Sequence, residues 1–293
     1  MQEPLPERLR RRAAETERAL EALVFAGSEH PALSRLGEAM RHGALGGGKR
    51  LRPFLLVEAC AAVGGREEDA VHAACAIEMV HSYSLVHDDL PAMDDAETRR
   101  GRPSVHAAFG EATGILAGDG LLTDAFGVLA AGPTPPSVTV ALVRLLAEGA
   151  GSDGMVGGQA MDLAPEDGGS AEIDAIQARK TGALIEAAAL MGGAVGGASE
   201  DQTKALRAYA RALGRAFQVQ DDVLDATAEA AAIGKPAGRD AEAGKATYVA
   251  LLGLDGARAR VAELTEAALA AARRLPEGGV LAELAAWQAK RTS

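Results

Sequence analysis

The chain has 293 residues, of which 48% are hydrophobic, 24% charged and 3% aromatic. This composition is typical of a globular protein and argues against a disordered one. The formal net charge of -11 argues against a nucleic-acid-binding surface, because binding to polyanionic phosphates requires clustered positive charge. Alanine is abundant and aromatic residues are few, which favours closely packed helices over β-sheets.

Apolar residues recur three and four positions apart along most of the chain, and this spacing predicts an all-α fold of about ten or more helices. No long Pro/Ser-rich linker and no repeat of fixed period interrupts the pattern, so we expect one domain over residues 1–293. An irregular stretch at residues 227–244 is a candidate lid. The predicted helices cover residues 5–26, 31–43, 51–63, 67–90, 112–130, 135–149, 170–193, 201–225, 245–272 and 278–290.

The cysteines and the apolar segments indicate the cellular compartment and whether the chain inserts into a membrane. Cys60 and Cys75 are the only cysteines, and both lie in alanine-rich helical segments, which favours reduced thiols. A cytoplasmic location is therefore the default expectation. The N-terminal segment is a charged amphipathic helix, not a signal peptide. No segment approaches about 18 uninterrupted apolar residues, so no stable membrane insertion is expected.

Two clusters of aspartates follow long apolar segments, DDLPAMDD at Asp88–Asp95 and DDVLD at Asp221–Asp225. On a helix, Asp221, Asp222 and Asp225 share an arc of about 100°. Neighbouring carboxylates repel one another unless a cation compensates. Oxygen ligands without nearby His or Cys favour Mg2+. Either cluster alone could be a solvated helix end; the two together, with the basic residues below, favour a metal site.

The placement of Asp94 remains open at this stage. On an ideal helix it would lie well away from Asp88, and Pro91 should disturb the helix.

Basic residues gather in GGGKRLRPF, where Gly46–Gly48 precede Lys49, Arg50 and Arg52. The helix that Pro53 opens offers free backbone donors and a positive dipole end, which suits a diphosphate. The spacing is not that of a P-loop, so nucleotide hydrolysis is not expected. A flexible surface loop with ordinary charges is the alternative.

A single histidine and several further basic residues could also contact phosphate. His81 precedes Asp88 by seven residues and lies on nearly the same helix stripe. A lone helical histidine is usually structural, but this position favours contact with a substrate phosphate. Each of the other basic residues could by itself be an ordinary surface charge. They are Arg99, Arg100, Lys180, Lys235 and Lys245.

Read in order, these motifs resemble the trans-isoprenyl diphosphate synthases, and most closely the bacterial farnesyl diphosphate synthases (geranyltranstransferases). The resemblance covers roughly residues 46 to 252. The fold that it implies is a single large helical bundle around a central cavity, usually a homodimer. It is carried by the segments GGKRLRP, HSYSLVHDDLPAMDD, RRGRPSVH, GGQAMDL, KTGALI, FQVQDDVLD and GKPAGRDAEAGKATY.

The resemblance also implies roles for individual residues. Isopentenyl diphosphate is held by Lys49, Arg52, His81 and Arg100, and the allylic diphosphate by Arg99, Lys180, Lys235 and Lys245. The oxygens of Thr181 and Gln218 face the developing allylic cation. Three Mg2+ ions are expected, and their ligands are Asp88, Asp89, Asp94, Asp221, Asp222 and Asp225.

Product length is expected to depend on Tyr83 and Ser84. Tyr83 lies five residues before Asp88, about 7.5 Å along the helix, where its ring could form the floor of the chain pocket. Ordinary core packing is the alternative. The aromatic residue and the two extra residues within DDLPAMD are similar to the bacterial farnesyl type, so we expect a fifteen-carbon product.

Three other readings remain. The first is a synthase of geranylgeranyl or longer diphosphates, the second a class I terpene cyclase and the third a non-catalytic regulatory subunit. The intact aspartate motifs argue against the last two. Two departures from the family pattern, Arg179 in place of the usual His and the tail WQAKRTS with Arg291, leave the details of substrate closure open.

Overall fold

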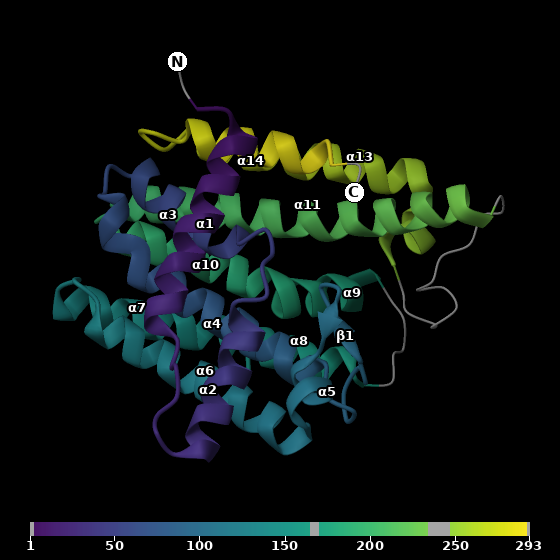
Figure 1. Cartoon of the computed structure of the whole chain (residues 1–293). Helices are drawn as coiled ribbons and strands as arrows, with labels where there is room; N and C mark the ends of the chain where they lie inside the picture. Colours follow the sequence, from purple (N-terminus) through teal and green to yellow (C-terminus); the bar gives the residue numbers. More distant parts are fainter. Residues whose placement is uncertain (1–2, 165–169, 234–246, 292–293) are drawn as a thin grey trace. The chain divides into compact units, whose positions relative to one another are not determined.

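A computed structural model describes residues 3–164, 170–233 and 247–291 (Figure 1). Within these ranges nearly all regular structure is helical, which confirms the predicted all-α class. The chain forms two compact units, one of residues 1–57 and 66–144 and the other of residues 58–65 and 145–293. A single domain over residues 1–293 therefore stays a prediction.

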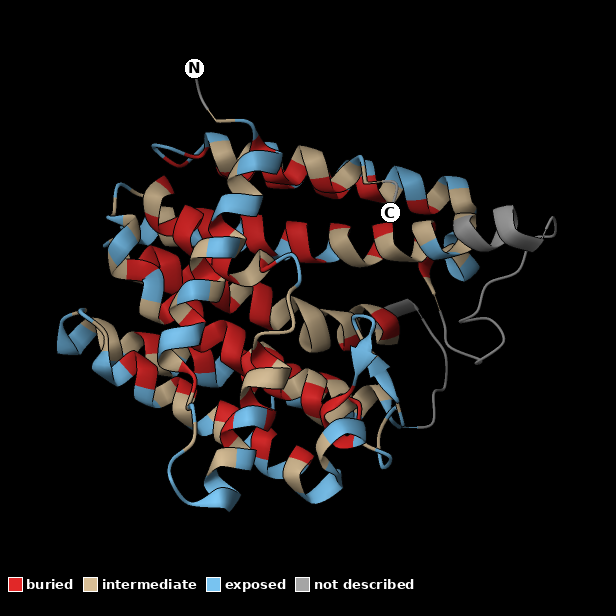
Figure 2. Ribbon diagram, viewed as in Figure 1, coloured by how far each residue is buried: buried red, intermediate tan, exposed pale blue. Residues whose placement is uncertain are grey.

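The first unit is built on a buried helix, α4, which packs against α1, α2 and α6. Helix α4 is buried along most of its length, and the buried Glu78 on it is compensated by an ion pair with Arg50. Ile77, Met79 and Val80 are fully buried on the same helix. Buried residues are drawn red in Figure 2. The helices of this unit are α1 (Leu5–Leu23), α2 (Pro31–Ala44), the start of α3 (Leu51–Ala62), the 3-10 turn η1 (Glu67–Ala70), α4 (Val71–Asp88), α5 (Val105–Phe109), α6 (Glu111–Ala131) and the start of α7 (Pro136–Ala150).

A short β-hairpin follows α4 and was not expected from the sequence. Strands β1 (Thr98–Arg99) and β2 (Arg102–Pro103) pair antiparallel, with Arg99 opposite Arg102. The two turn residues, Arg100 and Gly101, have φ of 53° and 74°. Two consecutive positive φ angles are the requirement of a type I′ hairpin turn, whose twist matches that of the strands. The hairpin therefore fixes where Arg99 and Arg100 lie.

The second unit is built on two long helices, α11 and α13, that pack side by side. Their shared core includes Val219, Val223, Tyr248 and Val261. Helix α13 bends at Gly253, whose φ of 69° is not helical. The unit contains the end of α7, α8 (Met155–Asp162), α9 (Ser170–Gln177), the π-helical turn η2 (Ala178–Gly182), α10 (Ala183–Val195), α11 (Glu200–Ile233), α13 (Tyr248–Ala272) and α14 (Gly279–Ala289).

The helices differ from expectation in several places. Helices α5 and α8 were not predicted. Helix α11 continues to Ile233, so residues 227–233 are helical and are not part of an irregular loop. The rest of the candidate lid, residues 234–246, lies outside the described residues. The helix expected over residues 170–193 is interrupted by the π-helical turn η2, an irregularity that is frequent at functional sites.

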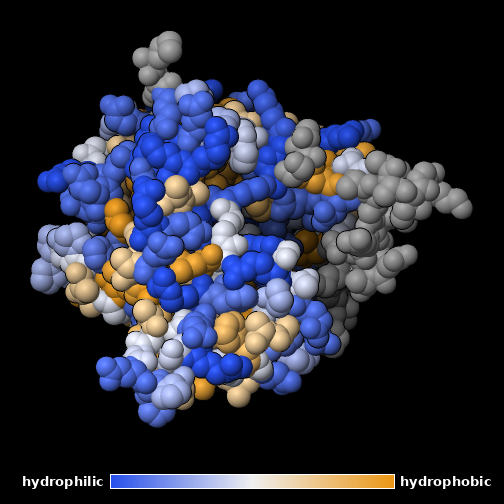
Figure 3. All heavy atoms as spheres, viewed as in Figure 1, coloured by the Kyte–Doolittle hydropathy of each residue, from blue (hydrophilic) through white to orange (hydrophobic). Residues whose placement is uncertain are grey.

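Helix α6 is long and apolar enough to span a bilayer by length and composition alone. It packs against α2, α4 and α5 of its own unit, and Leu121, Ala125 and Leu129 are buried there, while Ile115 and Leu116 are exposed. It also contains Asp119 and Asp124. The face of the molecule drawn in Figure 3 is mainly hydrophilic, with separate apolar patches.

Candidate active site

The glycine-rich segment lies against the turn of the hairpin. Gly47 and Gly48 have φ of 74° and 123°, and Arg100 donates a hydrogen bond to the carbonyl oxygen of Gly47. The φ of Gly48 strongly favours glycine, and a Cβ atom there would also lie 2.8 Å from Cζ of Arg100, which would have to move. The structure therefore brings together two of the predicted basic segments, which are about fifty residues apart in the sequence. Lys49 is exposed beside them.

Arg52 and Arg100 form a cationic environment around the uncharged His81; Arg52 and His81 are both half-buried. Nε of Arg52 is buried and has no hydrogen-bond partner. Burial lowers the pKa of Arg52 and outweighs the charge of Glu78, which raises it; Arg100 lowers it further. Burial, followed by the charges of Arg52 and Arg100, holds the pKa of His81 well below its usual value. Desolvated like charges and an unsatisfied donor are a suitable environment for an anion such as diphosphate.

The first acidic cluster turns back on itself after α4 ends. Asp88 is the last residue of α4, and Pro91 lies in the following turn, outside the helix. The backbone N–H of Asp94 donates to the carbonyl oxygen of Asp88 at 2.8 Å. On a continuous helix Asp94 would lie away from Asp88, but this turn returns its backbone to the side of Asp88.

Asp89 and Arg99 bind each other. Asp89 is 2% exposed, and its Oδ1 accepts hydrogen bonds from Nε of Arg99 at 3.0 Å and from Nη2 at 2.5 Å. The bond to Asp89 raises the pKa of Arg99. The resemblance assigns Asp89 to a metal ion and Arg99 to the allylic diphosphate. In this structure each is instead the partner of the other. A metal ion at Asp89 or a diphosphate at Arg99 would have to share this ion pair or displace it.

The two predicted chain-length residues lie one turn before the acidic cluster. Tyr83 is 6% exposed, and its ring meets the ring of His87 edge-on at 5.8 Å between centroids. Burial, with a smaller effect of Asp88, raises the pKa of Tyr83. The hydroxyl of Ser84 donates to the carbonyl oxygen of His81 at 2.9 Å, which is a bond within α4.

The second acidic cluster lies on α11 and is tied to both α13 and the C-terminal segment. Oδ2 of Asp222 accepts the backbone N–H of Tyr248 at 2.8 Å. Oδ1 of Asp221 accepts from Nη1 of Arg291 at 3.2 Å. Arg291 also lies over the ring of Phe217 at 5.0 Å. Asp225 is exposed.

The π-helical turn η2 carries Lys180 and Thr181. Nζ of Lys180 lies 2.6 Å from Oδ2 of Asp162, at the end of α8. The backbones approach closely here, since a Cβ atom on Gly158 would lie 2.1 Å from the backbone nitrogen of Lys180. Arg179 reaches back to the carbonyl oxygen of Ala175 at 3.4 Å.

Gln218 has a feature that fits its predicted role. Its Oε1 atom is buried and has no hydrogen-bond partner, so a carbonyl dipole remains available to a cationic group.

The two remaining predicted ligands of the allylic diphosphate, Lys235 and Lys245, lie outside the described residues.

Sequence reasoning missed the contacts of Asp162, Tyr248 and Arg291. Asp162 belongs to the GGQAMDL segment, which could have signalled it. The other two contacts join residues 26 and 70 positions apart. No local pattern in the sequence predicts such pairs.

The acidic residues have the chemistry that Mg2+ prefers, although no cage of protein ligands is formed. No group of three or more His, Cys, Asp or Glu side chains in the described ranges could hold a metal ion by itself. Mg2+ keeps several waters and commonly joins one or two carboxylates to phosphate oxygens, so incomplete clusters of oxygen donors fit it. Asp88 and Asp94 would hold it in the first unit, and Asp221, Asp222 and Asp225 in the second.

The helical fold, the two aspartate motifs and the cationic environment together define a class of all-α proteins equipped for diphosphates. Comparison with known proteins agrees: residues 34–277 match the family described as polyprenyl synthetase, and the chain belongs to that family.

Similar proteins include synthases of different products. The chain is 47% identical over 229 residues to geranylgeranyl pyrophosphate synthase 11 of Arabidopsis thaliana, and the match covers 75% of this chain but 64% of the plant chain. It is 45% identical to farnesyl diphosphate synthase of Geobacillus stearothermophilus, covering 80% and 81% of the two chains. A crystal structure of an FPP/GFPP synthase from Zymomonas mobilis has a TM-score of 0.86 at 37% identity, covering 97% of this chain and 98% of the other.

Proposed function

We propose that the protein is a Mg2+-dependent trans-prenyl diphosphate synthase, which condenses isopentenyl diphosphate with an allylic diphosphate such as dimethylallyl or geranyl diphosphate. The observation that carries the proposal is the cationic site of the first unit, where the buried Nε of Arg52 has no hydrogen-bond partner beside His81 and Arg100. Such a site accommodates a diphosphate anion, and a reaction that joins two diphosphates needs one site for the non-allylic partner.

The reaction begins with cleavage of the allylic C–O bond, and the electron pair leaves with the diphosphate. Magnesium, when bound, supplies positive charge that stabilises this leaving group. Arg99 and Lys180 add charge-assisted hydrogen bonds, and the oxygens of Thr181 and Gln218 stabilise the allylic cation. The alkene of isopentenyl diphosphate then attacks the cation, and loss of a proton to the released diphosphate forms the new double bond.

We further propose that the main product is farnesyl diphosphate. Tyr83 is a buried ring one turn before Asp88, in the position where a growing chain along α4 would meet it. The names of the similar proteins include both farnesyl and geranylgeranyl synthases, so the longer product is the second candidate.

Replacing Tyr83 tests the product-length proposal. Tyr83→Ala should shift the main product from fifteen to twenty carbons or more, as measured by chromatography of the dephosphorylated products. Tyr83→Phe is the matched control, because it keeps the ring, and its product should stay at fifteen carbons. An unchanged product distribution in Tyr83→Ala would refute the role of Tyr83.

Incubation of the purified protein with isopentenyl diphosphate, Mg2+ and each allylic primer in turn tests the activity itself. Prenyl diphosphate should form, and chelation of Mg2+ should stop its formation. No product with any primer would favour the regulatory-subunit alternative, and a cyclic hydrocarbon would favour a terpene cyclase.

We also propose that the protein acts as a cytoplasmic homodimer and neither inserts into a membrane nor binds nucleic acid. Light scattering would check the dimer, and cell fractionation would check the location.

A further inference from the structure

Arg50 lies between Lys49 and Arg52 in the sequence, but its side chain is buried against other helices of the first unit. Its side chain is 1% exposed. Nη1 lies 2.5 Å from Oε1 of Glu78 on α4, and Nη2 lies 2.6 Å from Oε1 of Glu17 on α1. Nη2 also donates to the carbonyl oxygen of Ala44, the last residue of α2, at 2.6 Å. One guanidinium group therefore joins the start of α3 to three other helices of the first unit.

The backbone of Arg50 has an unusual conformation. Its φ is 46°, in the left-handed region that residues other than glycine seldom adopt. Such strain persists only where the surroundings determine the conformation, and it is common at functional sites. The carbonyl oxygen of Arg50 accepts the N–H of Phe54 at 3.0 Å, so this turn also starts α3. The buried ion pairs of the side chain hold the turn in place.

The turn sets the direction of both neighbouring basic residues. Lys49 is exposed before it, and Arg52 lies one residue inside α3 with its unbonded Nε. A relaxed Arg50 with negative φ would rotate the preceding peptide and move Lys49 relative to Arg52. The two residues proposed to bind isopentenyl diphosphate therefore depend on a residue that does not bind it.

We propose that Arg50 is a positioning residue for the isopentenyl diphosphate site: its contacts with Glu17, Glu78 and the end of α2 hold the strained turn that presents Lys49 and Arg52 to the diphosphate. This inference rests on the function proposed above. If the wild-type protein makes no prenyl diphosphate, the proposed function fails; if it does, the following variants test Arg50 separately.

The main test separates the affinities for the two substrates. Arg50→Met removes the ion pairs at similar volume and should raise KM for isopentenyl diphosphate by about tenfold or more, while KM for geranyl diphosphate changes less than roughly twofold. Arg50→Lys keeps one charge for Glu78 but lacks the planar fork that binds several oxygens at once. It should show an intermediate KM for isopentenyl diphosphate.

A double variant distinguishes positioning from general stability. Arg50→Met leaves the buried carboxylate of Glu78 without its partner, which lowers the melting temperature and could prevent folding. Arg50→Met with Glu78→Gln removes that charge. It should recover most of the melting temperature but keep the raised KM for isopentenyl diphosphate.

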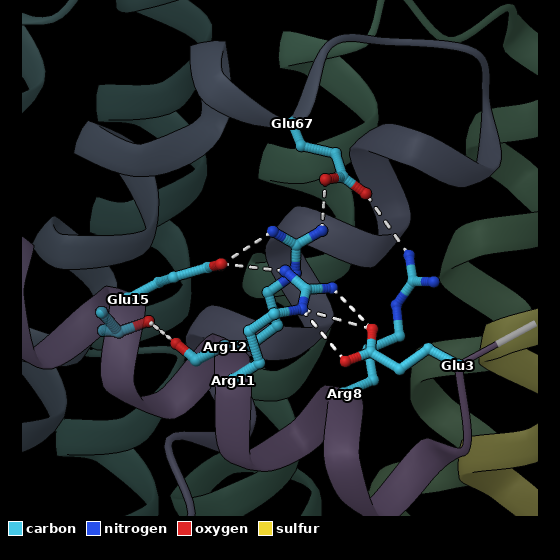
Figure 4. Close-up of polar contacts among 7 residues, drawn as sticks. Glu3, Arg8, Arg11, Arg12, Glu15 and Glu67 are labelled. Atoms are coloured by element: carbon cyan, nitrogen blue, oxygen red, sulfur yellow. Dashed lines mark hydrogen bonds and ion pairs between the residues drawn. The ribbon is translucent and has the colours of Figure 1, made fainter.

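Arg12 provides the matched control. It is also a nearly buried arginine of the first unit, with Nη1 2.9 Å from Glu15 and a second contact to Glu67 (Figure 4). However, it lies within α1, where the backbone is helical. Arg12→Met should lower the melting temperature without changing either KM. The proposal is overturned if the folded double variant binds isopentenyl diphosphate as the wild type does, or if Arg50→Met raises both KM values equally.

Discussion

His81 lies on α4 among the guanidinium groups of Arg52, Arg100, Arg50 and Arg99. Burial, and then these charges in the same order, keep its pKa well below the usual 6.5. At neutral pH the imidazole is therefore uncharged, and it can donate one N–H to a phosphate without adding to the local repulsion. The same arrangement means that protonation of His81 opposes the folded state.

A pH dependence of stability follows from His81. Because its pKa is lower in the folded than in the unfolded protein, the unfolded state binds more protons below pH 6.5. The contribution of His81 to stability is fully present above that pH and is lost as the pH falls. The melting temperature of the wild type should therefore fall by roughly a few degrees more between pH 7.5 and 5.5 than that of His81→Gln. Parallel falls in scanning calorimetry would contradict the lowered pKa.

At the scale of elements, the π-helical turn η2 shows how packing places the segment that carries Lys180 and Thr181. Helix α8 approaches η2 at Gly158, and the Nζ of Lys180 meets Asp162 at the end of the same helix. The turn is thus held at two points by one neighbouring element. A side chain at residue 158 would separate the two backbones.

Gly158→Ala tests this packing. Its Cβ would meet backbone atoms of Lys180, including Cα at 2.6 Å, and backbone cannot move aside as a flexible side chain can. We expect a loss of about 1–3 kcal/mol in the free energy of unfolding and a reduced kcat/KM for the allylic substrate. Urea denaturation and steady-state kinetics would measure both. Gly279→Ala is the control, because nothing lies within 4 Å of its Cβ, and it should change neither quantity appreciably.

At the scale of the molecule, the two aspartate motifs belong to different compact units. The proposed function requires both motifs to bind the same group of magnesium ions and diphosphate. A ligand that binds only the folded state stabilises it, by about 2.7 kcal/mol at a hundred times its Kd. Joint binding can therefore be measured without any turnover.

Mg2+ together with inorganic diphosphate should raise the melting temperature by more than the sum of their separate effects. Asp88→Ala and Asp221→Ala should each abolish most of this joint shift, because either motif alone holds an incomplete set of oxygen donors. Asp255→Ala is the control, since its side chain is fully exposed on α13, and its shift should match the wild type. A full joint shift in Asp88→Ala or in Asp221→Ala would remove that motif from the metal site.

The sequence by itself determined the features that depend on neighbours along the chain. Helical periodicity predicted the all-α class and most helix boundaries, because apolar spacing of three and four residues reports a buried helix face directly. The grouping of Asp221, Asp222 and Asp225 followed from the same geometry. The motif segments indicated the family, and residues 34–277 match it.

Only the tertiary structure decided which residues from separate elements contact one another. It paired Asp89 with Arg99, brought Arg100 to Gly47 through the hairpin, and turned Arg50 away from the basic residues beside it in the sequence. Local spacing could not predict these contacts, because each joins residues from separate elements. A guanidinium group beside two carboxylates of other helices serves the fold, whereas one buried without a partner is available to a ligand, and only the surrounding packing distinguishes the two.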